Sequence, residues 1–578
     1  MTGKSISLDG SSFRGNRFFA LFGTATIEMV GSFLVTITDT VIVGHYVGAA
    51  GVSGVNIIAP LFAVISFIAE VNGTGTAFAY GRLIGEFRKD EADRVFGQGI
   101  LTAAAVTAIS LIAFFFLFCP YLDSMQLSAE VRTEAENYWK YEQYVLALYP
   151  FCFLLTEIVY MEGDELLSNL SNIALIGGNM VFSIILCRRY GTAGASLGSL
   201  LGTSLCVLIL CVHFLKKSNT LRPVLSFRYQ VLREVIALSV TDSLPYLCWG
   251  LLDVCLIRLI VSRFSDAGLP ILAMVINMLE LTLIFDGIGE AMEPVAEIYM
   301  GEKNYSGESG LAGYGFRIAI AEGFLALELM FILAPIIPPM YGITDPELLS
   351  AAQSAVRTVS LALPFSSVLF LFSSQYRLIR KVSLTVVMTV CGQFLFVMIF
   401  AVLLTERMGI AGIWSSFSLS YLAVMILFGI FIFLRYRKLS FPWLCPEDET
   451  PYLNCSFVLS RQNVIDACDR FTEFMKEHNV PEPVRLRARL IIEETGTLAF
   501  ENNRTRESIA EYTVGITSDS VTVITRDTGR LSDMTQTGGD MDTLQEYVVE
   551  RLLSETADKQ YLASAGFNRC YYEIPFRS

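Results

Sequence analysis

Long apolar segments dominate the first three quarters of this 578-residue chain. Each is about 20 residues or longer, the length that a helix needs to cross the ~30 Å hydrocarbon core of a bilayer. Two sets of six helices are predicted, at residues 18–44, 54–80, 94–119, 143–161, 167–188 and 192–215, and then at 235–262, 269–300, 311–338, 353–376, 382–404 and 409–434. The pattern therefore predicts an all-α polytopic membrane protein with twelve transmembrane helices.

The two sets of helices look like copies of one unit. The motif RLIGE at residues 82–86 corresponds to IYMGE at residues 298–302, at the same place in each set. Duplicated helical units are typical of transporters, which bind their substrate between the halves near the middle of the membrane. We therefore expect two parallel six-helix bundles, formed by residues 1–220 and 221–440.

The hydrophobic pattern changes near residue 451. Val464 and Phe471 recur at helical spacing, whereas the segment VTVITRD at residues 521–527 alternates as a strand does. No further segment is long enough to cross a membrane. Residues 451–578, called the tail below, are predicted to form a separate α+β sandwich domain.

Basic residues in the short loops indicate the orientation of the chain. Arg82, Arg88 and Lys89 follow the second predicted helix, and Lys216 and Lys217 follow the sixth. Such residues gather on the cytoplasmic side of a membrane. We therefore expect a multi-pass protein of the cytoplasmic (inner) membrane, with both termini and the tail in the cytoplasm.

The composition agrees with this class and excludes others. Hydrophobic residues make up 53% of the chain, charged residues only 17%, and the mean hydropathy is +0.52, which is too apolar for an ordinary soluble protein. The net charge of −14 argues against nucleic acid as a partner. The scattered cysteines and the three histidines predict neither a disulfide framework nor a metal site. The N-terminus lacks the apolar core of a signal peptide.

Carboxylates inside the apolar segments are the first candidate functional residues. Glu28 and Asp39 lie 11 residues apart, which returns to the same face of a helix, and Asp242 and Asp253 repeat this spacing in the second set. An ionised group in the membrane costs at least ~2.5 kcal/mol, so it normally serves an ion or substrate path. The alternative is a structural ion pair, and Arg258 is the nearest candidate partner of Asp253.

A second group of acids lies in the predicted helix 269–300. Asp286, Glu290, Glu293 and Glu297 are spaced four, three and four apart, so they form one acidic stripe, and Glu280 lies nearby in the sequence. Four carboxylates on one face repel one another unless cations, protons or a water-filled cavity relieve them. The alternative is that the stripe emerges from the membrane at its end, near Glu297.

Several motifs resemble the multidrug and toxic compound extrusion (MATE) family over about residues 15–438. They are Asp39-Thr-Val-Ile-Val-Gly44, Pro60, Gly73, Gly75, Asn179 and Gly191-x-x-Gly194-Ala195. The resemblance implies two six-helix bundles around a central cavity, which exchange amphipathic organic solutes for sodium ions or protons and need no other cofactor. It also implies that Asp39 is the coupling carboxylate of the first helix and that Asp253 lies near the acidic position of the seventh.

One position departs from the family pattern. Many members carry an aspartate four residues after the helix-five asparagine, whereas this chain has Ser183 after Asn179. A coupling site with two carboxylates would then need another acid, and Glu28 is the candidate from helical spacing. The predicted ion-coupling residues are thus Asp39, Glu28, Asp253, Asp242 and Asn179.

The tail resembles the Bergerat-fold ATPase domain of histidine kinases and anti-sigma-factor kinases over about residues 455–576. The similar parts are the helix around Glu494 and the loop Asp527-Thr-Gly529, which would contact adenine. Leu498 stands where the family has a magnesium-binding asparagine, and leucine offers no oxygen to a hard cation. We therefore expect a tail that binds a protein partner or packs on the transporter, with ATP binding as the alternative.

The expected function is secondary active export of amphipathic, cationic solutes, with the tail as a cytoplasmic regulatory or partner-binding domain. The expected partners are a small organic solute, membrane lipid and a cytoplasmic regulatory protein. One alternative is a flippase for a lipid-linked precursor, although that cargo needs basic cavity residues and the intramembrane charges here are mainly acidic. The other is a membrane-anchored sensor or kinase-type regulator, against which Leu498 argues.

Overall fold

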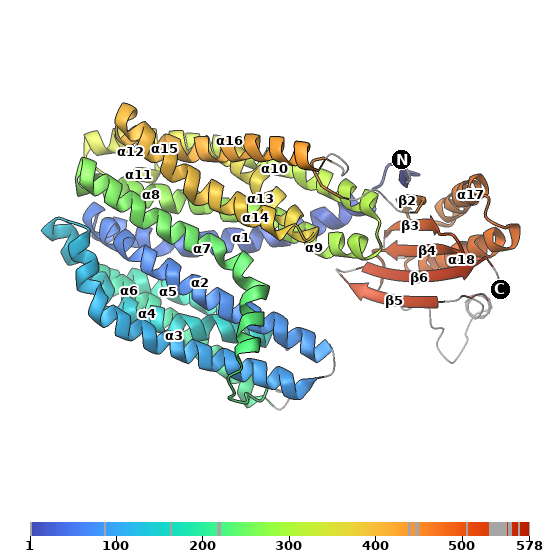
Figure 1. Cartoon of the computed structure of the whole chain (residues 1–578), viewed down its shortest axis with the longest axis horizontal. Helices are drawn as coiled ribbons and strands as arrows, with labels where there is room; N and C mark the ends of the chain where they lie inside the picture. Colours follow the sequence, from blue (N-terminus) through green and yellow to red (C-terminus); the bar gives the residue numbers. More distant parts are fainter. Residues whose placement is uncertain are drawn as a thin grey trace.

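The computed structural model describes residues 3–85, 88–161, 164–216, 221–436, 441–445, 450–504, 507–530, 558–564 and 567–576, with the single residues 552 and 556. A long body of helices carries a sheet domain at one end (Figure 1). The side chains of Glu28 and Asp242, two of the predicted coupling residues, lie outside the described part of the chain.

The first set of predicted helices is present. It consists of α1 (Phe13–Tyr46), α2 (Ala49–Gly85), α3 (Lys89–Ser124), α4 (Ala129–Met161), α5 (Glu165–Tyr190) and α6 (Thr192–Cys211), which η1 (Val212–Leu215) extends. The start of α4 was predicted too late, near residue 143. The intervening residues are rich in acids, but Val131, Ala135 and Tyr138 recur at helical spacing and are buried.

The second set is present too, although three of its predicted helices are interrupted. Its elements are α7 (Tyr229–Phe264), η2 (Asp266–Gly268), α8 (Leu269–Leu279), η3 (Glu280–Phe285), α9 (Asp286–Gly301), α10 (Tyr305–Leu333), α11 (Ile337–Met340), α12 (Pro346–Ser360), α13 (Leu363–Leu378), α14 (Val382–Val390), η4 (Cys391–Leu395), α15 (Phe396–Met408) and α16 (Ile410–Arg435). The 3₁₀ segment η3 separates α8 from α9, and the π segment η4 separates α14 from α15. A bend of 41° separates α12 from α13. Pro364 lies in the first turn of α13, where proline is tolerated.

The chain is a multi-pass membrane protein. Among the described residues, nine helices are long and apolar enough to cross a membrane, or ten when the bent pair α12–α13 counts as one span. The predicted total of twelve spans stays a prediction.

Helix α1 connects the two bundles. Near its start, Phe13 and Phe18 are fully buried together with Ile288 and Met292 of α9, in the second bundle. Near its end, Asp39 contacts residues of α4, α5 and α6 in the first bundle. A shift of α1 along its axis would therefore affect both halves.

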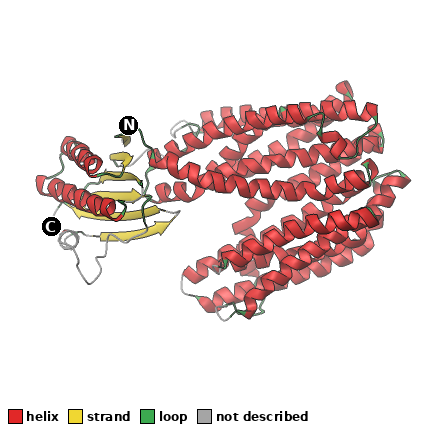
Figure 2. Ribbon diagram, turned by 180° about the vertical axis from the view of Figure 1, so that it is seen from behind, coloured by secondary structure: helices red, strands yellow, loops and turns green. Residues whose placement is uncertain are grey.

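The sheet domain combines the tail with the N-terminus. Its strands are β1 (Gly3–Ser7), β2 (Tyr452–Val458), β3 (Ile509–Ile516), β4 (Ser520–Asp527), β5 (Asp558–Ser564) and β6 (Phe567–Pro575), in the order β1-β2-β3-β4-β6-β5. Strand β1 pairs in parallel with β2, and the other neighbours are antiparallel. The helices α17 (Arg461–Glu477) and α18 (Glu482–Asn502) pack beside the sheet (Figure 2).

The mixed sheet with helices confirms the α+β character of the tail, but strand β1 was not predicted. The five residues GKSIS are short and half polar, so nothing local marks them as a strand. Their partner β2 lies at the other end of the chain. The segment LQEYVVERLLSE at residues 544–555, which its pattern predicts to be a helix, lies outside the described residues apart from residue 552.

Candidate functional site

Asp39 of α1 is the centre of a polar cluster inside the first bundle. Its Oδ2 accepts hydrogen bonds from Ser199 Oγ of α6 at 2.6 Å and from Tyr138 Oη of α4 at 3.1 Å. Its Oδ1 accepts one from Ser183 Oγ of α5 at 3.2 Å. Three other helices thus aim hydroxyl groups at one carboxylate.

Ser183 has more acceptors around it than it can serve. Its Oγ lies 2.8 Å from Asn179 Oδ1 and 3.0 Å from the carbonyl oxygen of Ala195, in addition to Asp39 Oδ1. A hydroxyl group carries a single hydrogen. The cluster therefore holds an excess of oxygen acceptors, which a bound cation or an additional proton would relieve. The structure places Asn179 beside Asp39, with Ser183 between them.

Glu142 of α4 belongs to the same cluster and was missed by the sequence analysis. It lies one helical turn beyond Tyr138 and interacts with the Tyr138 hydroxyl and with Asp39. Its side chain is only 4% exposed, and its Oε2 has no hydrogen-bond partner among the described residues. The missed signal is helical spacing, because Tyr138 and Glu142 share the buried face of α4.

A structural ion pair does not explain these acids. Within the described ranges, no lysine or arginine forms a salt bridge with Asp39, Glu142 or Asp253. Arg258, the suggested partner of Asp253, instead donates from Nη2 to Ser124 Oγ at 3.3 Å.

Two acids of the second bundle interact with each other, and one of them also interacts with α2. Asp253 of α7 is 4% exposed, interacts with the Asn56 amide of α2, and leaves its Oδ1 without a hydrogen-bond partner among the described atoms. Glu280 interacts with Asp253 and also has an unpartnered Oε2. The sequence predicted both acids but did not place them together.

Tyr246 of α7 lies where further acids meet. Its hydroxyl group interacts electrostatically with Glu70 of α2, Glu280 of η3 and Asp286 of α9. Glu70 was not singled out from the sequence. The break at η3 carries Glu280 and Asp286 at its two ends, so the stripe predicted for one straight helix starts from an interrupted one.

The other end of the predicted stripe is more open. Glu293 lies 3.9 Å from Arg377 of α13, with both side chains more than a third exposed. Glu290 and Glu297 are exposed. Glu280 and Asp286 are half-buried and thus less exposed than Glu290 and Glu297, and they are the stronger candidates for contact with a solute.

The loop predicted to contact adenine is occupied by protein groups. Asp527 Oδ1 accepts hydrogen bonds from the Gly529 amide at 2.9 Å and from Asn568 Nδ2 at 3.0 Å. Burial raises the pKa of Asp527, and these hydrogen bonds offset it only in part. Asn503, at the end of α18, accepts from the Arg530 amide at 2.7 Å and lies directly over Gly529. Glu494 lies nine residues before Asn503 on α18, about two and a half turns away, and is half-buried.

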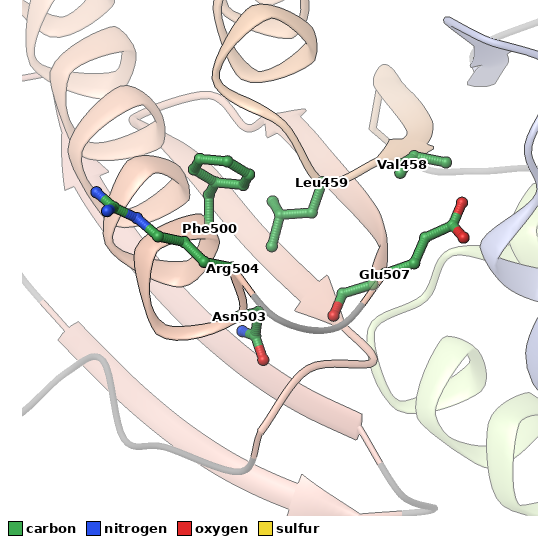
Figure 3. Close-up of a pocket in the computed structure, with 7 residues that line it drawn as sticks. Val458, Leu459, Phe500, Asn503, Arg504 and Glu507 are labelled. Atoms are coloured by element: carbon green, nitrogen blue, oxygen red, sulfur yellow. The ribbon is translucent and has the colours of Figure 1, made fainter.

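A cavity of about 420 Å³ lies next to this loop, at the end of α18 (Figure 3). Asn503 contributes to the cavity and to the Asp527 loop alike. The cavity is lined by Val458, Leu459, Phe500, Asn503, Arg504, Glu507 and Ser508.

A buried network of charges joins the tail to the helical body. Glu511 of β3 accepts hydrogen bonds from Arg14 Nε of α1 at 3.0 Å and from Tyr299 Oη of α9 at 2.6 Å. Arg526 of β4 lies 3.3 Å from the same carboxylate. Burial would raise the pKa of Glu511, but Arg14 and Arg526 outweigh it and hold this pKa below its ordinary value.

The network continues at the end of α9. Glu302 forms ion pairs with Arg526 and, at 2.6 Å, with Arg569 of β6. The side chains of Glu302, Glu511 and Arg526 are at most 2% exposed. We call this set the docking network; its members are Arg14, Tyr299, Glu302, Glu511, Arg526 and Arg569.

The arrangement of the helical body is that of known membrane transporters. A solved structure described as the inward-facing conformation of a multidrug resistance MATE family transporter is 20% identical, with a TM-score of 0.64 over 70% of this chain and 94% of that one. A MOP superfamily transporter from Pyrococcus furiosus is 18% identical, with a TM-score of 0.60 over 74% and 98%. A MATE structure in complex with MaL6 is 18% identical, with a TM-score of 0.59 over 73% and 96%.

Sequence comparison gives the same assignment. No curated protein sequence matches the chain. The family model MatE matches residues 25–185 and 254–403, which together are more than half of the chain and leave the tail unmatched. These matches contain Asp39, Glu142 and Asn179 in the first bundle and Glu280 in the second. The chain therefore belongs to the MatE family.

Proposed function

We propose that this protein is a secondary active exporter of amphipathic, cationic organic solutes, driven by an inward flow of sodium ions or protons. The observation that carries the proposal is Asp39, a carboxylate that three other helices surround with hydroxyl groups and that has no basic partner among the described residues. Acids inside membrane bundles mark ion or substrate paths. Family membership and the titles of the similar structures support export as the activity.

The coupling ion binds, in this proposal, between Asp39 and Glu142. The oxygens of Asp39, Asn179 and Ser183 form a set of hard ligands suited to a small cation, and Glu142 adds a second carboxylate. A proton is the alternative coupling ion, because two interacting carboxylates can share one proton and titrate as a pair. Glu142 thus replaces the acid that many family members carry at the position of Ser183.

The solute binds, in this proposal, between the bundles at the acids around Tyr246. Glu70, Glu280 and Asp286 come from three elements and interact electrostatically with the hydroxyl group of one tyrosine. Negative charge and a tyrosine face both attract organic cations. A phosphate-bearing lipid precursor would meet repulsion there, which disfavours the flippase alternative.

The tail is proposed to be a regulatory domain that acts on α1. The docking network bonds the first turn of α1 to β3, and the same helix carries Asp39 25 residues later, or ~38 Å along its axis at 1.5 Å per residue. The tail resembles Bergerat-fold ATPases. However, Leu498 replaces their magnesium-binding asparagine, and Asp527 is hydrogen-bonded within the protein, so we propose a domain without phosphotransfer activity.

Reconstituted vesicles test the proposal. The full chain should export a cationic dye when a sodium or proton gradient is imposed, and the Asp39→Asn variant should not. Absence of gradient-driven export by the full chain would refute the transport proposal. Removal of residues 451–578 should change the rate or its regulation, and an unaltered rate would refute only the role of the tail.

A further inference from the structure

An apolar groove opens in the second bundle. It has a volume of about 750 Å³ and is formed by α10, α13, α14 and α16 with Phe441 and Pro442. These helices lie together in the second bundle (Figure 1). Side chains at the groove mouth are exposed: Ile320, Phe324, Leu361, Leu419 and Phe441 are 38–54% exposed.

The lining offers no free polar group. Ser418 Oγ donates to the carbonyl oxygen of Thr358 at 3.0 Å, and Tyr376 Oη donates to the carbonyl oxygen of Pro442 at 3.1 Å. Both hydroxyl groups are therefore satisfied within the protein. A solute with hydrogen-bonding groups or charge would lose its hydration there without compensation, whereas a hydrocarbon chain would not.

The length of the groove matches one leaflet of a bilayer. Its lining on α13 runs from Pro364 to Tyr376, and on α16 from Ser418 to Ile432. At 1.5 Å per residue, these 12 and 14 steps are ~18 and ~21 Å long. Half of the hydrocarbon core is ~15 Å thick, so a single acyl chain in the groove would bring its headgroup to the end of these helices.

Positive charge lies at that end of the groove. The amide of Lys381 donates to the carbonyl oxygen of Tyr376, and Tyr436 donates to that of Ile432, so both residues adjoin the lining directly. The Lys381 ammonium and the Arg435 guanidinium both lie over the Tyr436 ring, at 5.5 and 5.8 Å. Neither forms an ion pair with a carboxylate within the described part of the chain.

We propose that this groove is a binding site for an anionic phospholipid, with one acyl chain between α10, α13 and α16 and the phosphate at Lys381 and Arg435. Basic pockets between membrane helices are suited to anionic headgroups. A bound lipid would also contact Phe441 and Pro442. These two residues are the first of the described segment 441–445, which precedes the tail in the sequence. The site is independent of the proposed ion coupling.

Gly429 allows a clean test. It lines the groove, and a Cβ built on it meets no atom within 4 Å. A leucine there would begin with a Cβ that meets no protein atom and would extend its side chain into the groove. Gly177 of α5 is equally open but lies in the first bundle, so Gly177→Leu is the matched control.

Native mass spectrometry of the full chain would compare phosphatidylglycerol with phosphatidylcholine of the same acyl composition. The native protein and Gly177→Leu should retain phosphatidylglycerol about tenfold better. Gly429→Leu should lose the bound lipid while keeping its melting temperature, and Lys381→Gln with Arg435→Gln should bind both lipids equally.

Three results would overturn the proposal. They are equal retention of both lipids by the native protein, unchanged lipid binding by Gly429→Leu, and displacement of the bound lipid by a cationic dye. The last result would make the groove a cargo site.

Discussion

Arg14 is the member of the docking network whose loss has the most direct consequence. Its Nε lies 3.0 Å from Glu511 Oε2, and its Nη2 donates to Ser5 Oγ of β1 at 2.9 Å. The substitution Arg14→Met keeps the length of the side chain and removes its charge. Glu511 would then stay buried with Arg526, Tyr299 and Ser456 as its remaining partners.

The expected cost follows from this geometry. Removing one partner of a buried ion pair costs about 3–5 kcal/mol, because the other charge stays buried. Glu511 keeps Arg526, so we take the lower limit of ~3 kcal/mol, which corresponds to about a 100-fold change in the docking equilibrium at ~1.4 kcal/mol per tenfold.

Hydrogen exchange measures this equilibrium in the intact protein. Strand β1 is protected by its pairing with β2 and by the bond from the Leu8 amide to the Ser456 carbonyl. The amides of residues 3–8 should exchange about 100-fold faster in Arg14→Met. The matched control Arg461→Met on α17 breaks an exposed ion pair with Glu501 of α18 and should change this exchange little.

A second variant separates lost attraction from a stranded charge. Arg14→Met combined with Glu511→Gln removes both charges, so part of the protection should return. Unchanged exchange of residues 3–8 in Arg14→Met would show that the network does not hold the tail on α1.

Three further predictions concern the same two regions. Asp39→Asn should abolish ion-coupled efflux in vesicles while the protein still inserts, and undiminished export would remove Asp39 from the mechanism. Glu142→Gln should lower gradient-driven export at least ~10-fold, because a buried charge inside the membrane serves the ion path. The control Glu136→Gln, at an exposed position of the same helix, should transport normally. The lowered pKa of Glu511 means that its stabilising effect is complete above the unfolded pKa of ~4.3 and is lost as the pH falls through the lower folded value. The protection factors of the β1 amides should therefore stay constant at pH 5–8 and fall only below about pH 4, and a fall already at pH 6 would contradict this assignment.

The membrane body was readable from the sequence because its signals are local. Apolar segments of spanning length and the recurrence of a six-helix unit need no knowledge of neighbours in space. The same holds for Asp39, since a charge inside an apolar helix is visible in one dimension. Breaks such as η3 were not visible, because a 3₁₀ turn between two apolar helices leaves no change in composition.

The partners of the acids were decided by tertiary structure. Helical spacing suggested Glu28 as the second acid near Asp39, and this stays a prediction because its side chain lies outside the described part of the chain. Among the described residues, Glu142 from a different helix interacts with Asp39. Spacing along one helix finds neighbours on that helix alone. Which residues of α4, α5 and α6 converge on α1 depends on how the helices pack.

The N-terminal strand β1 shows most clearly what tertiary structure decides and the sequence does not reveal. The sequence alone determined that the chain is a multi-pass membrane protein, that Asp39 lies inside an apolar helix and that the tail combines helices with strands. Only the fold decided that residues 3–7 pair with β2 and that Arg14 meets Glu511, almost the whole chain away. The physical reason is that strand pairing and ion pairing across such a separation depend on where the two bundles place the ends of the chain, which no local pattern records.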